Sequence, residues 1–250
     1  MYRRLVAAAL VAAALGGCAS RSISNSGYVE DGSGGSANPF YAGEIDDLDL
    51  FVPANRAGDA QSRISAALSD AKPVAAELGK PLLVIQSGAP APDAPMMAAL
   101  QGHFEVAPFS GIPQRDDRPY GANAAPASAS YGERLRLAAA EGGYRYVMVY
   151  WGVLESLTHR GVTKAVSWVP IVGMMVPDES QDMRIRLKAA VIDVASGRWR
   201  MVMPEPIDNS AISASINRAT SDQGQVADLK EAGYAKLAEM IVKEAAAATK

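Results

Sequence analysis

Cysteine and histidine are nearly absent from the sequence. Among 250 residues there is one cysteine, Cys18, and there are two histidines, His103 and His159. A single cysteine excludes an intramolecular disulfide and a zinc site built from thiolates. The two histidines form no His-Glu-x-x-His pair, and we expect both to be solvated side chains near element ends. No run of basic residues occurs and the net charge is −3, so nucleic acid is not an expected partner.

The amino terminus lacks an apolar run long enough to cross a membrane. Leu5 to Leu15 is apolar throughout, but a membrane-spanning helix needs about 20 such residues. Arg3 and Arg4 precede this run, and small residues follow it. A positive start, a short apolar core and a small-residue cleavage site are the parts of a secretory signal. We therefore expect residues 1–17 to be a signal peptide.

The residues Leu15-Gly16-Gly17-Cys18 resemble the lipobox of bacterial lipoproteins. This resemblance implies that the signal is cut before Cys18, which receives a diacylglycerol and a further acyl chain such as palmitate. Several acyl chains on one residue give stable membrane anchoring. Asp directly after the cysteine marks retention at the inner membrane in that family, and Ala19 stands there instead. The resemblance therefore implies an outer-membrane lipoprotein that faces the periplasm.

Little in the next stretch favours a packed structure. From Ala19 to Ala42 the chain is rich in Ser, Gly and Asn, a composition that buries too little apolar surface to offset its ordering entropy. The acidic residues of 44–49 follow. They admit a metal site, but the pattern favours a solvated connection. We expect residues 18–54 to be the lipidated cysteine with a flexible tether, and 55–250 to be one globular domain.

The first half of that domain alternates between strands and helices. Apolar residues at helical spacing predict a helix over 64–78, which Pro73 kinks or splits. Residues 81–86 and 104–109 read as strands, with a helix over 94–101 between them that Asp93 can cap. A helix over 131–141 and a strongly apolar strand over 145–155 follow.

The second half is rich in antiparallel strand signals. Residues 183–194 alternate between apolar and polar side chains, and a turn at Ala195-Ser196-Gly197 joins them to a partner strand over 198–203. A final helix carries Val226, Leu229, Leu237 and Ile241 on one face. The fold class predicted is α/β (α+β): a single mixed sheet with a strand-helix-strand-helix first half, antiparallel strands in the second half, and a C-terminal helix packed on the sheet.

Two segments resemble a group of poorly characterised envelope lipoproteins. These are Ala165 to Glu179 and Ala189 to Gly197, which are similar to segments of the rhombotarget lipoproteins. More loosely, the order of elements is similar to the periplasmic domains of curli-secretion and penicillin-binding-protein-activator lipoproteins. The resemblance implies a fold and carries no catalytic residue, because one fold can host many functions.

The apolar segment from Ala165 to Pro177 stands out because it carries no charge and is interrupted by Pro170 and Gly173. A central strand would not tolerate Pro170, which lacks the N–H that a ladder needs. One interpretation is a bent hairpin over the domain's own core. This interpretation is favoured because apolar segments in compact domains are mostly buried. The other is an exposed surface that contacts a protein partner or lipid. Its candidate contact residues are Trp168, Val169, Ile171, Met174 and Met175.

Catalytic motifs are missing as well. Ser87 follows a strand, as a hydrolase nucleophile would, but the Gly-x-Ser-x-Gly elbow is absent. No glycine-rich phosphate loop occurs. Paired glycosidase carboxylates leave no spacing signature, so that chemistry stays open. We predict no catalytic residue, metal or cofactor, and a lipid-anchored module that binds an envelope protein or a second copy of itself. The alternative hypothesis is a periplasmic hydrolase such as a peptidase.

Overall fold

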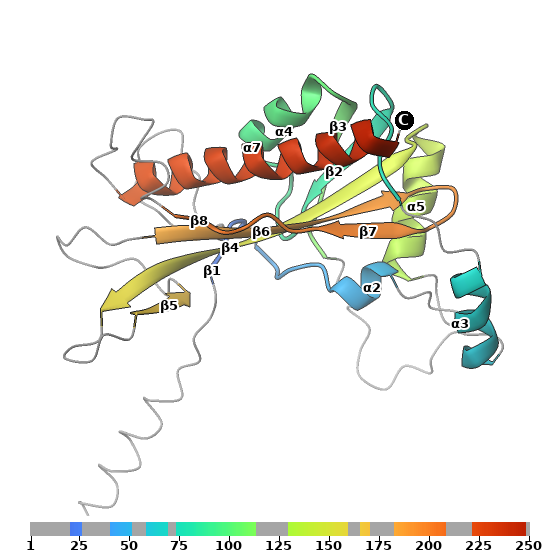
Figure 1. Cartoon of the computed structure of the whole chain (residues 1–250), viewed down its shortest axis with the longest axis horizontal. Helices are drawn as coiled ribbons and strands as arrows, with labels where there is room; N and C mark the ends of the chain where they lie inside the picture. Colours follow the sequence, from blue (N-terminus) through green and yellow to red (C-terminus); the bar gives the residue numbers. More distant parts are fainter. Residues whose placement is uncertain are drawn as a thin grey trace, which may run out of the picture.

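The computed structural model describes residues 21–26, 41–51, 59–69, 74–113, 130–159, 166–170, 183–208 and 222–248. Its strands and helices form a mixed sheet with helices on both faces (Figure 1). This is the α/β architecture that the sequence predicts. In chain order the elements are β1 (Arg21–Ser22), α2 (Asp47–Phe51), α3 (Ala60–Ser69), β2 (Pro81–Gln86), α4 (Ala94–Gln101), β3 (Glu105–Phe109), α5 (Tyr131–Glu141), β4 (Tyr146–His159), β5 (Val166–Pro170), β6 (Met183–Asp193), β7 (Trp199–Val202), β8 (Ile207–Asp208) and α7 (Asp222–Ala248).

The sheet is organised around β4, its longest strand. The main order is β3-β2-β4-β6-β7, with β2 parallel to both β3 and β4 and the other pairs antiparallel. One edge of β4 pairs with β6 from Tyr146 to Ser156. The opposite edge pairs in turn with β2, β1 and β5. A single apolar strand therefore holds the parallel half, the antiparallel half and the amino-terminal segment together.

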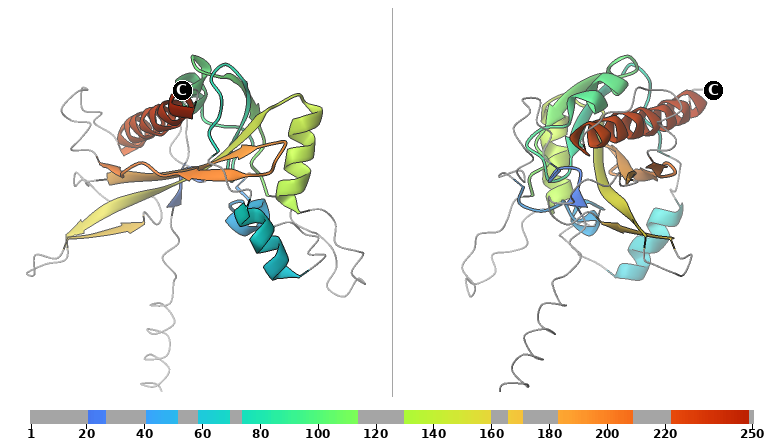
Figure 2. Two further views of the ribbon diagram at one scale, coloured as in Figure 1. Left: turned by 45° about the vertical axis from the view of Figure 1, so that its right-hand side comes forward. Right: turned by 90° about the vertical axis from the view of Figure 1, so that its left-hand side faces the viewer.

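The helices cover the two faces of the sheet unequally. Helices α4 and α7 pack on one face, and α2 and α5 lie on the other (Figure 2). Strand β6 shows the difference, because its side chains alternate between faces. Met183, Ile185 and Leu187 belong to the core under α7, whereas Arg184 and Arg186 point to the other face. Along that other face, β6 becomes apolar only from Ala190, where α5 approaches.

Close backbone approach fixes α2 against the start of α5. A Cβ atom added at Gly132, the second residue of α5, would lie 1.9 Å from the carbonyl oxygen of Leu50 in α2. Only glycine permits this contact. Ser130 caps α5, since its hydroxyl accepts the N–H of Glu133 while the Glu133 carboxylate accepts the N–H of Ser130. The observed α5 and α4 match the helices predicted over 131–141 and 94–101.

Two segments within the predicted tether, 18–54, belong to the folded body. Residues 21–26 form β1 and a turn, and Ile23 is 1 % exposed in the core under α7. Residues 41–51 include α2, which buries Leu50 in the second core. A Cβ added at Gly152 would lie 2.8 Å from the Cγ2 atom of Ile23, so the Ile23 side chain packs directly over this glycine. The Ser-rich composition around Ile23 predicts a flexible tether, but these serines have a structural role. The Ser22 hydroxyl accepts the N–H of Ser24, and the Ser26 hydroxyl donates to the carbonyl of Ile23.

The helix predicted over 64–78 is shorter than expected. Helix α3 ends at Ser69, and residues 74–77 lie outside any helix. Ile64 and Leu68 are 51 % and 71 % exposed, so they are not core residues within the described structure. Val74 and Ala76 are buried beyond the break. Pro73, whose ring and missing N–H oppose a continuous helix, lies outside the described residues.

Replacing Ile23 with Ala tests whether the amino-terminal segment belongs to the core. We expect a loss of about 2 to 5 kcal/mol in the free energy of unfolding, because a buried side chain leaves a cavity. The matched change Ile64→Ala in exposed α3 should cost less than about 0.5 kcal/mol. Urea unfolding followed by circular dichroism measures both. Equal effects of the two changes would contradict the placement of Ile23.

Candidate functional site

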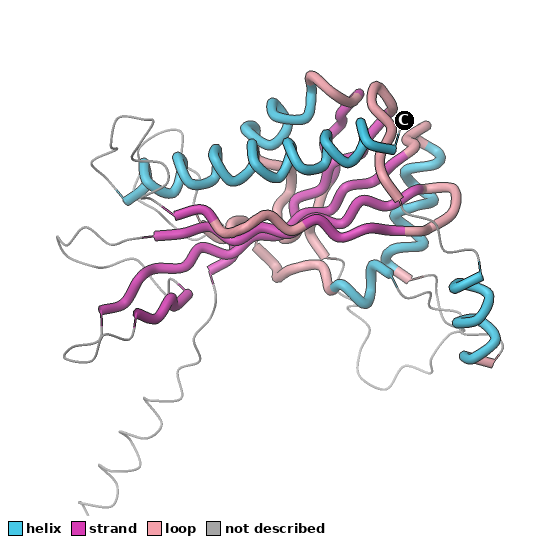
Figure 3. The backbone as a smooth tube through the Cα atoms, viewed as in Figure 1, coloured by secondary structure: helices cyan, strands magenta, loops and turns pink. Residues whose placement is uncertain are grey.

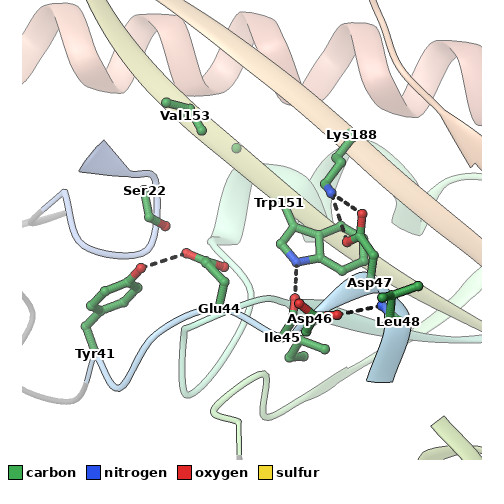
Figure 4. Close-up of a pocket in the computed structure, with 11 residues that line it drawn as sticks. Ser22, Tyr41, Glu44, Ile45, Asp46, Asp47, Leu48, Trp151, Val153 and Lys188 are labelled. Carbon is green, nitrogen blue, oxygen red and sulfur yellow. Dashed lines mark hydrogen bonds and ion pairs between the residues drawn. The ribbon is translucent and has the colours of Figure 1, made fainter. Parts of the chain in front are cut away.

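A groove lies on the α2 face of the sheet, where β6 still carries charged side chains. It encloses about 490 Å³ between residues 41–48 and strands β1, β4 and β6. Figure 4 shows its side chains. We call it the α2 groove, and its lining residues are Ser22, Tyr41, Glu44, Ile45, Asp46, Asp47, Leu48, Trp151, Gly152, Val153 and Lys188.

Trp151 and Lys188 form the floor of the α2 groove. They are cross-strand partners on β4 and β6, and the Lys188 ammonium lies 4.7 Å from the centre of the indole ring. Such a cation–π contact is favourable at this distance. The Trp151 indole N–H donates to the carbonyl of Ile45 at 2.9 Å. Lys188 also donates to both carboxylate oxygens of Asp47, at 2.8 and 2.6 Å. These contacts hold residues 45–47 onto the sheet.

The acidic residues of the groove serve local structure. Asp46 accepts the N–H of Leu48 at 2.7 Å, which satisfies a donor in the first turn of α2. Tyr41 donates to one oxygen of Glu44 at 3.2 Å. The other oxygen of Glu44 is buried and has no hydrogen-bond partner in the described part of the chain. Burial, followed by the Glu44 charge, raises the pKa of Tyr41.

No group of three or more metal-binding side chains gathers among the described residues. Asp46 and Asp47, within the acidic stretch 44–49, are engaged with the α2 backbone and with Lys188 instead. The lining of the groove therefore combines apolar surface with charged side chains that are already engaged, and the Trp151 ring lies at its floor.

A second polar cluster is buried at the carboxyl end of β2. Lys230 of α7 is 1 % exposed and donates to the Asp93 carboxylate at 2.9 Å. Tyr234, one helical turn later, donates to the same oxygen at 2.5 Å. Removal from water lowers the pKa of Lys230, and the Asp93 charge opposes that effect. Asp93 thus joins the start of α4 to the middle of α7.

The cluster continues through β2 and β4 to the amino-terminal segment. The backbone N–H of Asp93 donates to Gln86 at 2.8 Å, and the Tyr150 hydroxyl donates to the same side-chain oxygen at 2.5 Å. The Gln86 amide donates to the Ser24 hydroxyl at 3.1 Å, which in turn donates to the Ser87 carbonyl at 2.5 Å. Carboxyl ends of parallel strands often bind ligands. Here, packed and mutually bonded side chains occupy this position.

Ser87 cannot serve as an accessible nucleophile in this structure. It is fully buried, and its hydroxyl accepts the N–H of Ile45 at 2.7 Å. His103 lies just after α4 and is exposed, whereas the His159 side chain lies outside the described residues.

The structure places part of the predicted contact segment. Trp168 and Val169 lie in β5, opposite Leu157 and Ser156 of β4. Their side chains, and the whole of Ile171, Met174, Met175 and Cys18, lie outside the described residues. Pro170 ends β5, which agrees with the expectation that it cannot sit in the middle of a central strand.

Sequence reasoning missed the buried cluster, although one signal pointed to it. Lys230 and Tyr234 sit four residues apart, between the apolar positions Val226, Leu229 and Leu237 of α7. A lysine within an apolar helical face indicates burial with a partner. Asp93 was expected only as a helix cap, but its side chain makes no cap hydrogen bond and turns to α7.

Comparison with known families identifies the chain. The family model described as YafT bacterial lipoprotein matches residues 46–244. The chain belongs to the YafT family of bacterial lipoproteins. Most of the folded body falls in this match, and membership establishes a lipoprotein of the bacterial envelope. The finer likeness to rhombotarget, curli-secretion and penicillin-binding-protein-activator lipoproteins stays a prediction.

No curated protein matches the chain. Within the described residues, no helix has the length and apolar character needed to cross a bilayer.

Breaking the buried ion pair between Lys230 and Asp93 tests how much it contributes to the stability of the fold. We expect Lys230→Met to lower the free energy of unfolding by about 3 to 5 kcal/mol, because Asp93 keeps a charge that has lost its cation. Lys236→Met on the same helix removes an exposed pair with Glu239 and should cost less than about 1 kcal/mol. Urea titrations of the two variants give the comparison. Similar small losses would show that the pair is dispensable.

The pH dependence of stability offers a separate check on Tyr150. Burial, and then the Asp93 charge, raise the pKa of Tyr150 well above its usual value. The folded state therefore keeps this proton where the unfolded chain loses it, so stability is full below about pH 10 and falls above it.

We expect Tyr150→Phe to reduce this alkaline fall by up to about 1.4 kcal/mol per pH unit. A smaller fall remains from Tyr41, Tyr131 and Tyr146, whose pKa values burial also raises. Unfolding free energies measured from about pH 8 to 11 test the difference. An unchanged slope in the variant would contradict the role given to Tyr150.

Proposed function

We propose that this lipoprotein is anchored through acylated Cys18 on the periplasmic side of the outer membrane. There it serves as a non-catalytic module that binds an envelope protein or assembles with a second copy of itself. Strand β5 and the apolar segment that follows it form the contact surface. The contact residues are Trp168, Val169, Ile171, Met174 and Met175.

The pairing of β5 is the observation that supports this proposal. Among the described strands, β5 pairs with β4 alone, so its outer edge has no strand partner there. Its residues, Val166-Ser167-Trp168-Val169-Pro170, include no charge. Exposed sheet edges normally carry charges or proline that discourage pairing, and only Pro170 at the end does so here. An uncharged edge strand suits addition of a strand from a partner.

Strand β3, the edge strand beside β2, differs from β5 in composition. Strand β3 carries Glu105 at its start and Pro108 as the fourth of its five residues. Proline cannot donate to a neighbouring strand, and a charge disfavours burial against one. The contrast between β3 and β5 makes β5 the better candidate for strand addition.

The buried polar cluster supports a binding role over hydrolysis. Ser87, which follows β2 as a hydrolase nucleophile would follow a strand, is enclosed and bonded to the Ile45 N–H. Lys230, the buried amine, is committed to Asp93. These polar groups hold the fold together.

Photo-crosslinking in living cells from a probe at Trp168 tests the proposal. We expect a discrete protein adduct, because the probe stands on the edge that a partner would cover. A probe at Leu137, which is 61 % exposed on α5, is the matched control and should give none. An adduct with lipid alone, or none with the protein folded, would overturn the protein-binding role.

Trp168→Ser complements the crosslink. It should abolish the adduct formed from a probe at Ser167 while the urea midpoint stays unchanged, since an edge side chain used for binding adds little to the core. A large loss of stability would instead assign Trp168 to the core.

A further inference from the structure

The position of β1 limits how far the folded body can stand from a lipid anchor. Arg21, the first residue of β1, comes three residues after Cys18. Three residues of fully extended chain span at most about 11 Å. The headgroup layer of one leaflet is roughly 5 to 8 Å thick, so this reach exceeds it by only about 3 to 6 Å.

From this we infer that the body lies directly on the membrane, with the β1–β5 end of the sheet facing the lipid surface. The inference rests on the proposed anchoring at Cys18. It replaces the long flexible spacer that composition suggests with a leash of three residues.

The leash is short only because β1 and its turn are held firmly. The N–H of Ile23 donates to the carbonyl of Gly152 at 3.0 Å, and the Ile23 side chain is in the core. Ser24 bonds to the Ser87 carbonyl, and Ser26 donates to the Ile23 carbonyl at 2.7 Å. Lengthening the leash would require removing Ile23 from the core and breaking these bonds.

The direction of β1 selects which end of the body faces the lipid. Strand β1 is antiparallel to β4, with Arg21 opposite Leu154 and Ser22 opposite Val153. Its amino-terminal end therefore points along β4 toward Glu155. Glu155 is opposite Pro170, the last residue of β5. The anchor thus lies on the side of the body that carries β5.

Distances along β4 place β5 close to the anchor. Trp168 is opposite Leu157, three residues beyond Leu154, which corresponds to about 10 Å along a strand. Figure 3 shows the β4–β5 hairpin reaching away from the helices. Tryptophan is favoured at the membrane–water interface, where its ring spans apolar and polar layers. A partner that pairs with β5 would then have to lie in or on the same membrane.

Fluorescence quenching on vesicles tests this orientation. Cys18 is the only cysteine, and in the anchored protein its sulfur carries the diacylglyceryl group as a thioether, so one added cysteine can be labelled specifically. Labels at Ser167→Cys and Trp168→Cys would sample the two sides of β5. Labels at Leu137→Cys on α5 and Glu239→Cys on α7 are exposed controls. The acylated full chain is placed in phosphatidylethanolamine–phosphatidylglycerol vesicles whose headgroups carry a nitroxide quencher.

We expect loss of fluorescence at both β5 positions and none at the two controls. Inserting ten Gly and Ser residues between Ala19 and Ser20 should restore the β5 signal, because the body can then leave the surface. Quenching at Leu137 or Glu239, or none at any position, overturns the orientation while leaving the anchor in place. Quenching at β5 that persists after the insertion would show that the short leash is not what holds the body on the membrane.

A separate control distinguishes failure of the anchor from failure of the orientation. Cys18→Ser should leave the chain unbound in vesicle flotation. If this variant still floats with the vesicles, the proposed anchoring at Cys18 fails, and the inference about the leash fails with it.

Discussion

The ion pair between Lys230 and Asp93 is the contact on which the arrangement of the molecule depends. A charged amine and a carboxylate are taken out of water together, which is tolerable only when each finds full compensation. Tyr234 and the network through Gln86, Tyr150 and Ser24 supply that compensation. The pair thereby fixes the position of α7 relative to α4. The same network reaches the amino-terminal segment beside β1.

Two cores of different extent follow from this arrangement. The core under α7 runs along the length of β6, while the core under α5 covers only part of the opposite face. Where α5 is absent from that face, Trp151 and Lys188 form the floor of the α2 groove. Residues 41–51 close over this floor through Ile45, Asp47 and the buried Leu50. The uneven covering is thus what leaves room for the α2 groove.

Much of the fold could be predicted from sequence, because its elements are locally consistent. The alternation in β6, the turn at Gly197 and the apolar face of α7 each match one regular period. Residues 21–26 could not be predicted, since a single isoleucine among serines has no period. The role of Asp93 was also missed, because a residue before a helix reads as a cap whether or not its side chain makes that bond. Both depend on contacts between residues that are distant in sequence.

The candidate contact site could also be predicted only in part from the sequence. Pro170 excludes a central strand from sequence alone, and the structure places it at the end of β5. The nearness of β5 to the first strand depends on the long-range register of β4, which no local pattern encodes.

Ile23 has a mechanical consequence, because it is a core residue only five positions after Cys18. A chain with a slack spacer would take up a pull on its lipid anchor by straightening. Here such a pull would reach the Ile23–Gly152 hydrogen bond and the packing around it with almost no extension. Extracting the lipid and disturbing the core would therefore be coupled events, so the folded body itself would resist removal of its anchor.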